Sequence, residues 1–574
     1  MSESHVRPIR QETYGLPKIM ATGLRLLPDG IAAAEHCQSF RKTDLAADDS
    51  DGLSTMEATM FDFRSERRKW RTRIKDVGLQ SYPTLPSFDG RTQDLYGKAL
   101  PRGVLLPRLE ADRERINYWM SPSELLRYRF TFGQLIIGKL GGEFIGYLDD
   151  RPMVTIAGAR AGKTSTILEP NLYLYSGSAL VLDPKGELAR SARFRRAMGH
   201  DVFVLDPFGQ SGERCACYNP LDELDPESPT LIDDVASVTN ALVVDDGDSR
   251  SQHWNDSARK LLTGIILLTL SLHRSERNLV TVRELLCLTY KPLADAVKQA
   301  AAKALAEANL EEKQAYFDTN KVAVKTLLNR MAALGERFGG IAAAAANRFL
   351  GSPHTERGSV FSTAATQTDF LDSLMLRQTL RRSDFSLEAL RGDRPATIFL
   401  CLPVGRMQQH ARWLRLVTQL ACTVLEGLGP YPRDRPPILF MMEEFATLAH
   451  MEIMERAAAY FPGFGIKLWV VLQDVTQLQR YYSAGWETFL GNAGLLQFFA
   501  NGDEETLRYA ASRMEKLIAP FELRMAFSRQ RHSQLLLMEG MPPAAALRLE
   551  HADVARIRER AMKAADRTRD LARL

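Results

Sequence analysis

The chain of 574 residues has only six cysteines, and none lies in a CxxC pair or at another metal-ligand spacing. This excludes a zinc ribbon or a disulfide-stapled small domain, and reduced thiols are expected. Long hydrophobic runs are also missing, since no window approaches the about 18 apolar residues of a membrane span. The polar N-terminus lacks the apolar core of a signal peptide. The sequence therefore predicts a soluble, cytoplasmic chain.

No single sign of charge dominates. The 74 Lys and Arg residues nearly balance the 70 Asp and Glu residues, which leaves a net charge of +4. A non-specific nucleic-acid coat is therefore excluded, and a polyanionic partner would have to meet local basic patches. Hydrophobic residues make up 45% and charged residues 25%, as in ordinary globular proteins. The length predicts three to four domain equivalents.

Changes in composition divide the chain into five predicted parts. These are an N-terminal region (1–125), a first part of a nucleotide-binding domain (126–227), an all-helical insertion (228–350), a second part of the nucleotide-binding domain (351–552) and a basic C-terminal helix (553–574). The N-terminal region is a candidate docking segment. Its residues 64–75 (RSERRKWRTRIK) carry seven positive charges and one negative charge. They form either a solvated amphipathic helix or a patch that binds phosphate or a partner.

Short apolar runs closed by turn residues predict the fold class. They lie at 144–148, 153–156, 179–182, 201–205, 396–402, 437–442 and 466–472. Such runs are typical of a parallel sheet that is buried on both faces. Within the insertion, helical spacing predicts helices over 255–272, 281–308, 310–335 and 338–349. We therefore expect an α/β protein with a doubly wound, mainly parallel sheet and an inserted all-alpha domain.

The strongest motif is the segment 157–164 (AGARAGKT), which lies between an expected strand and an expected helix. It fits the P-loop pattern GxxxxGK[ST], except that Ala157 replaces the first glycine. Small residues let backbone N–H groups cradle phosphates at the positive end of the following helix. Lys163 would neutralise phosphate charge, and the Thr164 hydroxyl would ligate Mg²⁺. The motif thus predicts binding of ATP and Mg²⁺.

Two carboxylates follow the apolar run 438–442. A buried strand would deliver both to the carboxyl edge of the sheet, where Glu443 would hold Mg²⁺ through water. Glu444 would orient and deprotonate the attacking water. Such motifs usually begin with aspartate, so the longer Glu443 would shift the metal geometry and slow hydrolysis. The alternative is an ordinary strand that ends in surface acids.

Gln473 and the turn 183–187 (DPKGE) are further candidates on the same edge. Gln473 ends the run 466–472 and either senses the γ-phosphate or is a plain strand-end glutamine. For the segment 183–187 two interpretations are open. Either Asp183 or Lys185 would lie next to the nucleotide, or the segment forms a turn with no role in binding. The predicted nucleotide-binding residues are Gly158, Ala159, Arg160, Ala161, Gly162, Lys163, Thr164, Ser165, Asp183 and Lys185.

Seven motifs follow one another along the chain. They are the P-loop, 181–187 (VLDPKGE), 218–222 (YNPLD), 253–262 (HWNDSARKLL), 357–363 (RGSVFST), 443–445 (EEF) and 472–473 (LQ). In this order they resemble the type IV coupling protein family, the TraG/TraD-like ATPases of conjugation and type IV secretion. The resemblance covers about 135–552, including 535–549 (LLLMEGMPPAAALRL), which resembles the family's closing strands.

The resemblance implies a RecA-like nucleotide-binding domain in a ring hexamer that hydrolyses ATP between subunits. Residues that take the family's catalytic and metal roles by position are Lys163, Thr164, Glu443, Glu444 and Gln473. Arg160 matches a frequent P-loop arginine. The implied partners are a relaxase, protein effectors or adaptors, and components of the secretion channel. Single- or double-stranded DNA is a further implied ligand.

Two departures from the family pattern stand out. Most relatives begin with two membrane helices and this sequence contains none, so attachment to the inner membrane is expected only through a partner protein. Many relatives carry an arginine shortly before the glutamine strand, but residues 457–466 contain none. Arg357 or Arg406 would supply it to a neighbouring subunit, or each is a surface or ion-paired residue. Two other functions stay open: a nucleotide-binding recruitment scaffold with little hydrolysis, and a DNA-pumping ATPase outside secretion.

Overall fold

The computed structural model describes residues 119–131, 133–245, 249–307, 319–432, 434–515 and 518–571, all within the unit Thr59–Leu574. The candidate docking patch at 64–75 lies outside the described residues. Eleven strands form one sheet in the order β2-β1-β11-β10-β9-β3-β8-β7-β4-β6-β5. They are β1 (Leu135–Leu140), β2 (Glu143–Tyr147), β3 (Met153–Ala157), β4 (Ala179–Leu182), β5 (Asp201–Leu205), β6 (Ala396–Leu400), β7 (Ile438–Met442), β8 (Ile466–Leu472), β9 (Leu495–Phe499), β10 (Ser533–Met538) and β11 (Ala544–Leu547).

The seven strands from β9 to β5 are parallel to one another, and β3 lies inside this half of the sheet with Ala157 opposite Phe499 of β9. Side chains alternate between the two faces of a strand. Met153 and Ala157 accordingly join one core cluster, whereas Val154 and Ile156 join another. Both faces are therefore covered, as near-continuous apolar strands require. The predicted doubly wound, mainly parallel sheet is confirmed.

The strands β10, β11, β1 and β2 extend the sheet in antiparallel fashion. A buried polar network crosses the junction with the parallel half. The Thr155 hydroxyl donates to Gln497 Oε1 at 2.8 Å, and Gln497 Nε2 donates to Gln534 Oε1 at 2.6 Å. Gln534 Nε2 donates in turn to the backbone oxygen of Ile137 at 2.7 Å. Because buried amides are stable only when their polar groups are paired, this network favours one register around β3.

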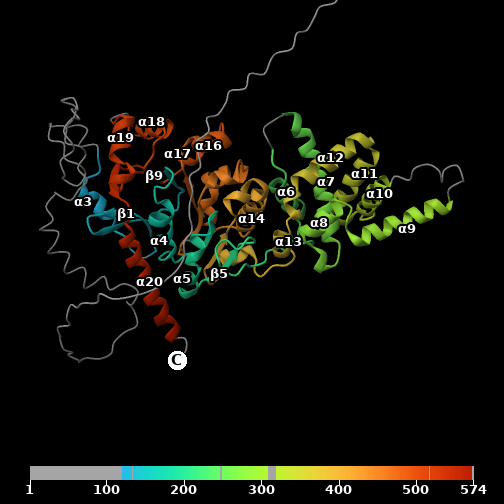
Figure 1. Cartoon of the computed structure of the whole chain (residues 1–574), viewed down its shortest axis with the longest axis horizontal. Coiled ribbons are helices and arrows are strands. Elements are labelled where there is room, and N and C mark those ends of the chain that lie inside the picture. Colours follow the sequence, from blue (N-terminus) through green and yellow to red (C-terminus); the bar gives the residue numbers. More distant parts are fainter. Residues whose placement is uncertain are drawn as a thin grey trace, which may run out of the picture. The chain divides into compact units, whose positions relative to one another are not determined.

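Helices cover the sheet and fill the insertion (Figure 1). They are α3 (Pro122–Leu125), α4 (Glu169–Leu172), α5 (Ala192–Ala197), α6 (Leu231–Leu242), α7 (Ser249–Leu270), α8 (Leu279–Leu286), α9 (Lys291–Glu307), α10 (Thr319–Ala332), α11 (Ile341–Gly351), α12 (His354–Gln367), α13 (Leu374–Thr379), α14 (Met407–Gly427), α15 (Glu452–Tyr460), α16 (Thr476–Tyr481), α17 (Trp486–Gly491), α18 (Glu504–Arg513), α19 (Pro520–Ala526) and α20 (His551–Leu571). A π-helical turn, η3 (Thr164–Leu168), precedes α4. No helix in the part of the chain that the structure describes is both long and apolar enough to cross a membrane.

The insertion is a helical body in which α7 packs against α8, α11 and α12 (Figure 1). The described residues between β5 and β6 contain no strand, which confirms an inserted all-alpha part. The expectation of one helix over 281–308 is wrong. Helix α8 ends at Leu286, Leu288 has a φ of +60°, and α9 begins at Lys291. Pro292 explains the break, because proline is tolerated in the first turn of a helix but not in its interior.

The C-terminal helix α20 is less exposed than its sequence indicates. Val554 and Ile557 are buried in a cluster with Tyr173 and Phe194, and α20 contacts η3, α4 and α5. A helix that is polar overall can bury such a narrow apolar stripe and leave its other faces in water. The helix therefore covers the segment that follows the P-loop.

A buried lysine on β8 makes stability depend on pH. Lys467 is 2% exposed, its ammonium lies 4.9 Å from the Tyr147 ring centroid, and it donates to the backbone oxygen of Arg151 at 2.9 Å. Burial lowers the pKa of Lys467 to about 7, although the Asp149 carboxylate opposes this shift. Lys467 thus holds fewer protons in the folded state than in the unfolded state between about pH 7 and about pH 10. From pH 7.5 to pH 9.5 we expect the free energy of unfolding of the wild type to rise by about 2 kcal/mol relative to that of Lys467→Met. Denaturant unfolding of both proteins at each pH measures this difference. A parallel pH profile for both proteins would contradict this.

Candidate nucleotide-binding site

The carboxyl ends of β3, β8 and β7 lie at one edge because these strands are parallel neighbours in the sheet. The P-loop follows β3, Glu443 and Glu444 follow β7, and Gln473 follows β8. In open α/β sheets this edge is where ligands bind. The topology therefore brings the predicted catalytic residues together from three separate segments.

Glycine is required at two P-loop positions for different reasons. A Cβ atom on Gly158 would lie 2.2 Å from the backbone oxygen of Ala500, so a side chain there would push the two loops apart. Gly162 has a φ of +86°, which L-residues rarely adopt. Ala157, which replaces the first glycine of the pattern, is the buried last residue of β3. Its methyl group packs in the core, so the departure leaves the loop intact.

Lys163 turns back onto the P-loop. Its ammonium donates to the backbone oxygens of Ala157 at 2.6 Å and Gly158 at 3.3 Å. Burial lowers the pKa of Lys163, and the carboxylates of Glu444 and Glu443 act in the opposite direction. The cation is thus held inside the loop that a phosphate group would enter. It can exchange its carbonyl contacts for phosphate oxygens.

Thr164 and Glu443 form the candidate metal site. The Thr164 hydroxyl donates to Glu443 Oε1 at 2.5 Å, and Glu443 is 1% exposed. Burial raises the pKa of Glu443, against the hydrogen bond from Thr164. Glu443 Oε2 is buried and has no hydrogen-bond partner among the described residues. Mg²⁺ prefers a few oxygen ligands, keeps several waters and would satisfy this oxygen, so the two residues fit it.

Glu444 follows directly in a left-handed conformation, with φ 53° and ψ 47°. Its carboxylate accepts hydrogen bonds from Gln473 Nε2 at 3.0 and 3.1 Å. The Gln473 backbone N–H donates to Gln477 Oε1 of α16 at 2.9 Å. Such strained residues gather where a side chain must be aimed. Gln473 therefore orients Glu444, and its contact with a γ-phosphate stays a prediction.

Asp183 is fully buried and its carboxylate is used by the turn that follows β4. It accepts the backbone N–H groups of Glu187 at 3.1 Å and Ala189 at 2.7 Å. Burial raises the pKa of Asp183 to about 7, although these hydrogen bonds lower it. Lys185 is exposed, and its charge opposes the burial effect on Glu443. Lys185 thus lies close to Thr164 and Glu443, the candidate metal site, whereas Asp183 stabilises the turn through its hydrogen bonds.

The other predicted P-loop residues lie around Lys163. Ala159 and Arg160 are exposed, and Arg160 has a φ of +57°. Ala161 is buried, and the Ser165 hydroxyl donates to the backbone oxygen of Gly162 at 3.5 Å. No group of three or more His, Cys, Asp or Glu side chains in the described ranges forms a ready-made metal cage. A cation here would complete its shell with water or phosphate oxygens.

A family model described as type IV secretory system conjugative DNA transfer matches residues 121–516. The chain belongs to this family. The predicted type IV coupling protein family is thereby confirmed. Conjugal transfer protein TraG of Escherichia coli is 26% identical over 336 residues, which cover 57% of this chain and 49% of that protein. Protein VirD4 of Agrobacterium fabrum is 26% identical over 381 residues, which cover 66% of this chain and 51% of VirD4.

The chain spans about half the length of these curated relatives. Solved structures of the conjugative coupling protein TrwB share its fold. The unbound monoclinic form of TrwBΔN70 has a TM-score of 0.55 at 14% identity, over 75% of this chain and 92% of that one. TrwB in complex with ADP and Mg²⁺ has a TM-score of 0.53 at 15% identity over the same shares. The predicted RecA-like P-loop fold is confirmed.

Arg357 and Arg406, the candidates for a trans arginine, contact residues outside the P-loop. Arg357, in α12, donates to the backbone oxygen of Phe349 at 3.2 Å within the helical body. Arg406 is exposed after β6, with its guanidinium 5.4 Å from the Phe208 ring centroid. Arg456, one position before the segment 457–466, pairs with Glu426 at 3.2 Å. The trans role of Arg357 or Arg406 stays a prediction.

Sequence motifs missed one residue that touches the P-loop. Arg548, just after β11, donates to the backbone oxygen of Ala161 and is 3% exposed. It belongs to the segment that resembles the closing strands of the coupling family, but no motif marks an arginine there as part of a phosphate site. Only the pairing of β11 with β10 and β1 brings it beneath the loop.

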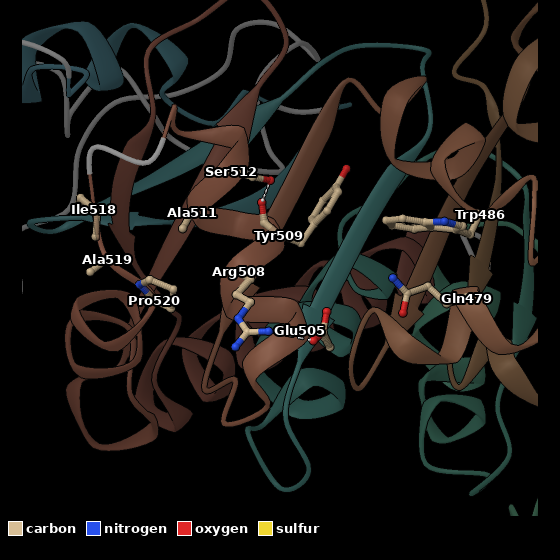
Figure 2. Close-up of a pocket in the computed structure, with 10 residues that line it drawn as sticks. All are labelled: Gln479, Trp486, Glu505, Arg508, Tyr509, Ala511, Ser512, Ile518, Ala519 and Pro520. Carbon is tan, nitrogen blue, oxygen red and sulfur yellow. Dashed lines mark hydrogen bonds and ion pairs between the residues drawn. The ribbon is translucent and has the colours of Figure 1, made fainter.

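A pocket of about 590 Å³ lies between α16, α17, α18 and the start of α19 (Figure 2). Trp486 and Tyr509 meet edge to face with ring centroids 5.5 Å apart. Ile518 and Pro520 lie on the opposite side of the pocket in Figure 2. The predicted site residues are absent from its lining among the described residues. The coupling-family motifs therefore leave it unassigned.

Proposed function

We propose that this chain is a coupling ATPase that recruits a relaxase–DNA complex or a protein effector to a conjugation or type IV secretion channel and couples ATP hydrolysis to its transfer. The observation that carries this proposal is the sheet edge where Lys163, the Thr164–Glu443 pair and the Glu444–Gln473 pair meet. Membership in the conjugative DNA transfer family supports the transport role.

The residues of this edge have separate tasks in the proposed reaction. Lys163 leaves the loop carbonyls and binds the β- and γ-phosphates of ATP. Glu444, oriented by Gln473, positions a water molecule and accepts its proton as the water oxygen attacks the γ-phosphorus. The bond from that phosphorus to its bridging oxygen breaks, and the electron pair leaves with ADP.

Thr164 and Glu443 would hold Mg²⁺ beside the phosphates. The metal, when bound, supplies positive charge that screens the phosphate oxygens. Glu443 Oε2, which has no hydrogen-bond partner within the described part of the chain, supports this assignment. A solved TrwB structure contains ADP and Mg²⁺, which supports the same ligands in this chain. Glu443 has one more methylene group than the usual aspartate, so its reach to the metal differs.

We propose that the active form is a homo-oligomer, a ring hexamer with nucleotide between subunits. Arg357 or Arg406 then enters the site of the next subunit, since each lies outside the P-loop of its own chain. The helical body selects the relaxase, effector or adaptor. A partner protein connects the chain to the inner membrane, and DNA, single- or double-stranded, passes local basic patches.

This function can be tested by measuring ATP turnover of the purified protein while single-stranded DNA is titrated in. We expect turnover that DNA stimulates several-fold, together with a rise in native mass to that of a hexamer when nucleotide is added. A polyanion such as heparin is the matched control, because it shares the charge but not the bases. Turnover that no DNA concentration changes would contradict the DNA-transfer form of the proposal.

A recruitment scaffold with little hydrolysis is the second candidate. Glu443 in place of aspartate and the absence of arginine from 457–466 favour it. A scaffold would bind ATP and assemble but release almost no phosphate, with or without DNA. The same assay therefore separates the two functions.

A further inference from the structure

Arg548 ties the C-terminal hairpin to the P-loop. One guanidinium nitrogen donates to the backbone oxygen of Ala161, and the other terminal nitrogen donates to the backbone oxygen of Arg529 at 2.9 Å. The guanidinium carbon lies 4.9 Å from the ring centroid of Phe499, the last residue of β9. The backbone N–H of Arg548 donates to the oxygen of His532 at 2.7 Å. A buried cation is thus fixed from several directions directly behind the loop.

The contact with Ala161 bears on phosphate binding through peptide geometry. The carbonyl of Ala161 and the N–H of Gly162 belong to one planar peptide unit, in which they point in opposite directions when it is trans. An arginine that holds the carbonyl on its own side of the loop therefore turns the Gly162 N–H toward the other side. Phosphate cradles consist of such N–H groups pointing inward.

We propose that Arg548 is a positioning residue for the P-loop, which sets the direction of the Gly162 N–H and so the affinity for the phosphate chain of the nucleotide. This rests on the proposed function only insofar as ATP binds at the P-loop. Arginine suits the task because its planar guanidinium donates in two fixed directions, whereas lysine is a point charge on a flexible stem.

The position of Arg548 in the chain extends its role. The residue lies between β11 and α20, and α20 packs on η3 and α4, the segment that continues from the P-loop. The Lys139–Asp553 ion pair, at 2.6 Å, fastens α20 to β1. The C-terminal segment therefore holds both the phosphate loop and the helix that follows it.

The test measures nucleotide affinity of Arg548→Met and Arg548→Lys in the full chain. We expect Arg548→Met to raise the Kd of a fluorescent ATP analogue about tenfold, equivalent to about 1.4 kcal/mol. We expect Arg548→Lys to raise it about threefold, since lysine keeps the positive charge but lacks the two fixed donor directions of the guanidinium. In competition experiments the affinity of each variant for tripolyphosphate should fall by the same factor as its affinity for the ATP analogue. The KM for ATP should rise while kcat changes little.

Arg195→Lys is the matched control. Arg195 is 0% exposed and donates to the backbone oxygen of Gly177 at 2.7 Å, before β4 at the amino edge of the sheet. The Arg195→Lys substitution should lower the melting temperature and leave the Kd of the ATP analogue unchanged. If Arg548→Lys folds and has the Kd of the wild type, the proposal is overturned. If Arg548→Met does not fold, the test rests on Arg548→Lys. If Lys163→Ala also binds normally, the P-loop assignment fails instead.

Discussion

Replacing Lys163 with alanine should abolish ATP turnover, with kcat/KM at least about a thousandfold lower, or about 4 kcal/mol of transition-state stabilisation. The ammonium lies inside the loop, bound to the backbone oxygens of Ala157 and Gly158. Charge that develops on the phosphates would then lack its compensating partner. Phosphate release from saturating ATP is the measurement.

Lys260→Ala is the control for that experiment. Lys260 is exposed on α7 in the helical body, so its loss changes the net charge by the same amount without touching the sheet edge. Its turnover should equal that of the wild type. Wild-type turnover in Lys163→Ala would mean that residues 157–164 do not form the catalytic P-loop.

Replacing Glu444 with glutamine should separate binding from hydrolysis. We expect kcat to fall about a hundredfold to a thousandfold, because an amide cannot accept the proton of the attacking water. Affinity for ATP should change little, since Lys163 and the Thr164–Glu443 pair stay in place. Single-turnover hydrolysis together with equilibrium binding of a fluorescent ATP analogue measures both quantities.

Glu426→Gln is the matched control for the glutamate. This residue lies on α14 and pairs at the surface with Arg456, away from the carboxyl ends of β3 and β7. Turnover should be unaffected by its change. Undiminished kcat in Glu444→Gln would remove the general-base role. A joint loss of binding and turnover would show instead that Glu444 supports the structure of the loop.

The strands that the sequence predicted are mainly apolar runs, although β8 contains Lys467. Two that it did not predict carry polar side chains inside the sheet: Gln497 in β9, and Lys139 in β1. Gln497 is paired with Thr155 and Gln534, and Lys139 is paired with Asp553, 414 positions along the chain. Local pattern cannot show such distant partners, so the runs look too polar for buried strands.

The same limit separates the predicted from the unpredicted parts of the site. The P-loop and the acids after β7 are short motifs in which the strand, the turn and the reactive side chain are consecutive. The hydrogen bond between Gln473 and Glu444 could be predicted only with the strand order, in which β8 lies between β3 and β7. Arg548 contacts Ala161 across 387 positions, so its place behind the loop follows only from the assembled sheet.

The helical body also serves as the connection between two adjacent parallel strands. The chain leaves the carboxyl end of β5 and re-enters at the amino end of β6, and the two strands pair with Asp201 opposite Ala396. Parallel neighbours require a crossover of about a dozen residues or more. A protein reduced to its sheet therefore needs a linker that spans a five-residue strand, about 16 Å. Force on the helical body reaches the outer strands before the strand that carries the P-loop.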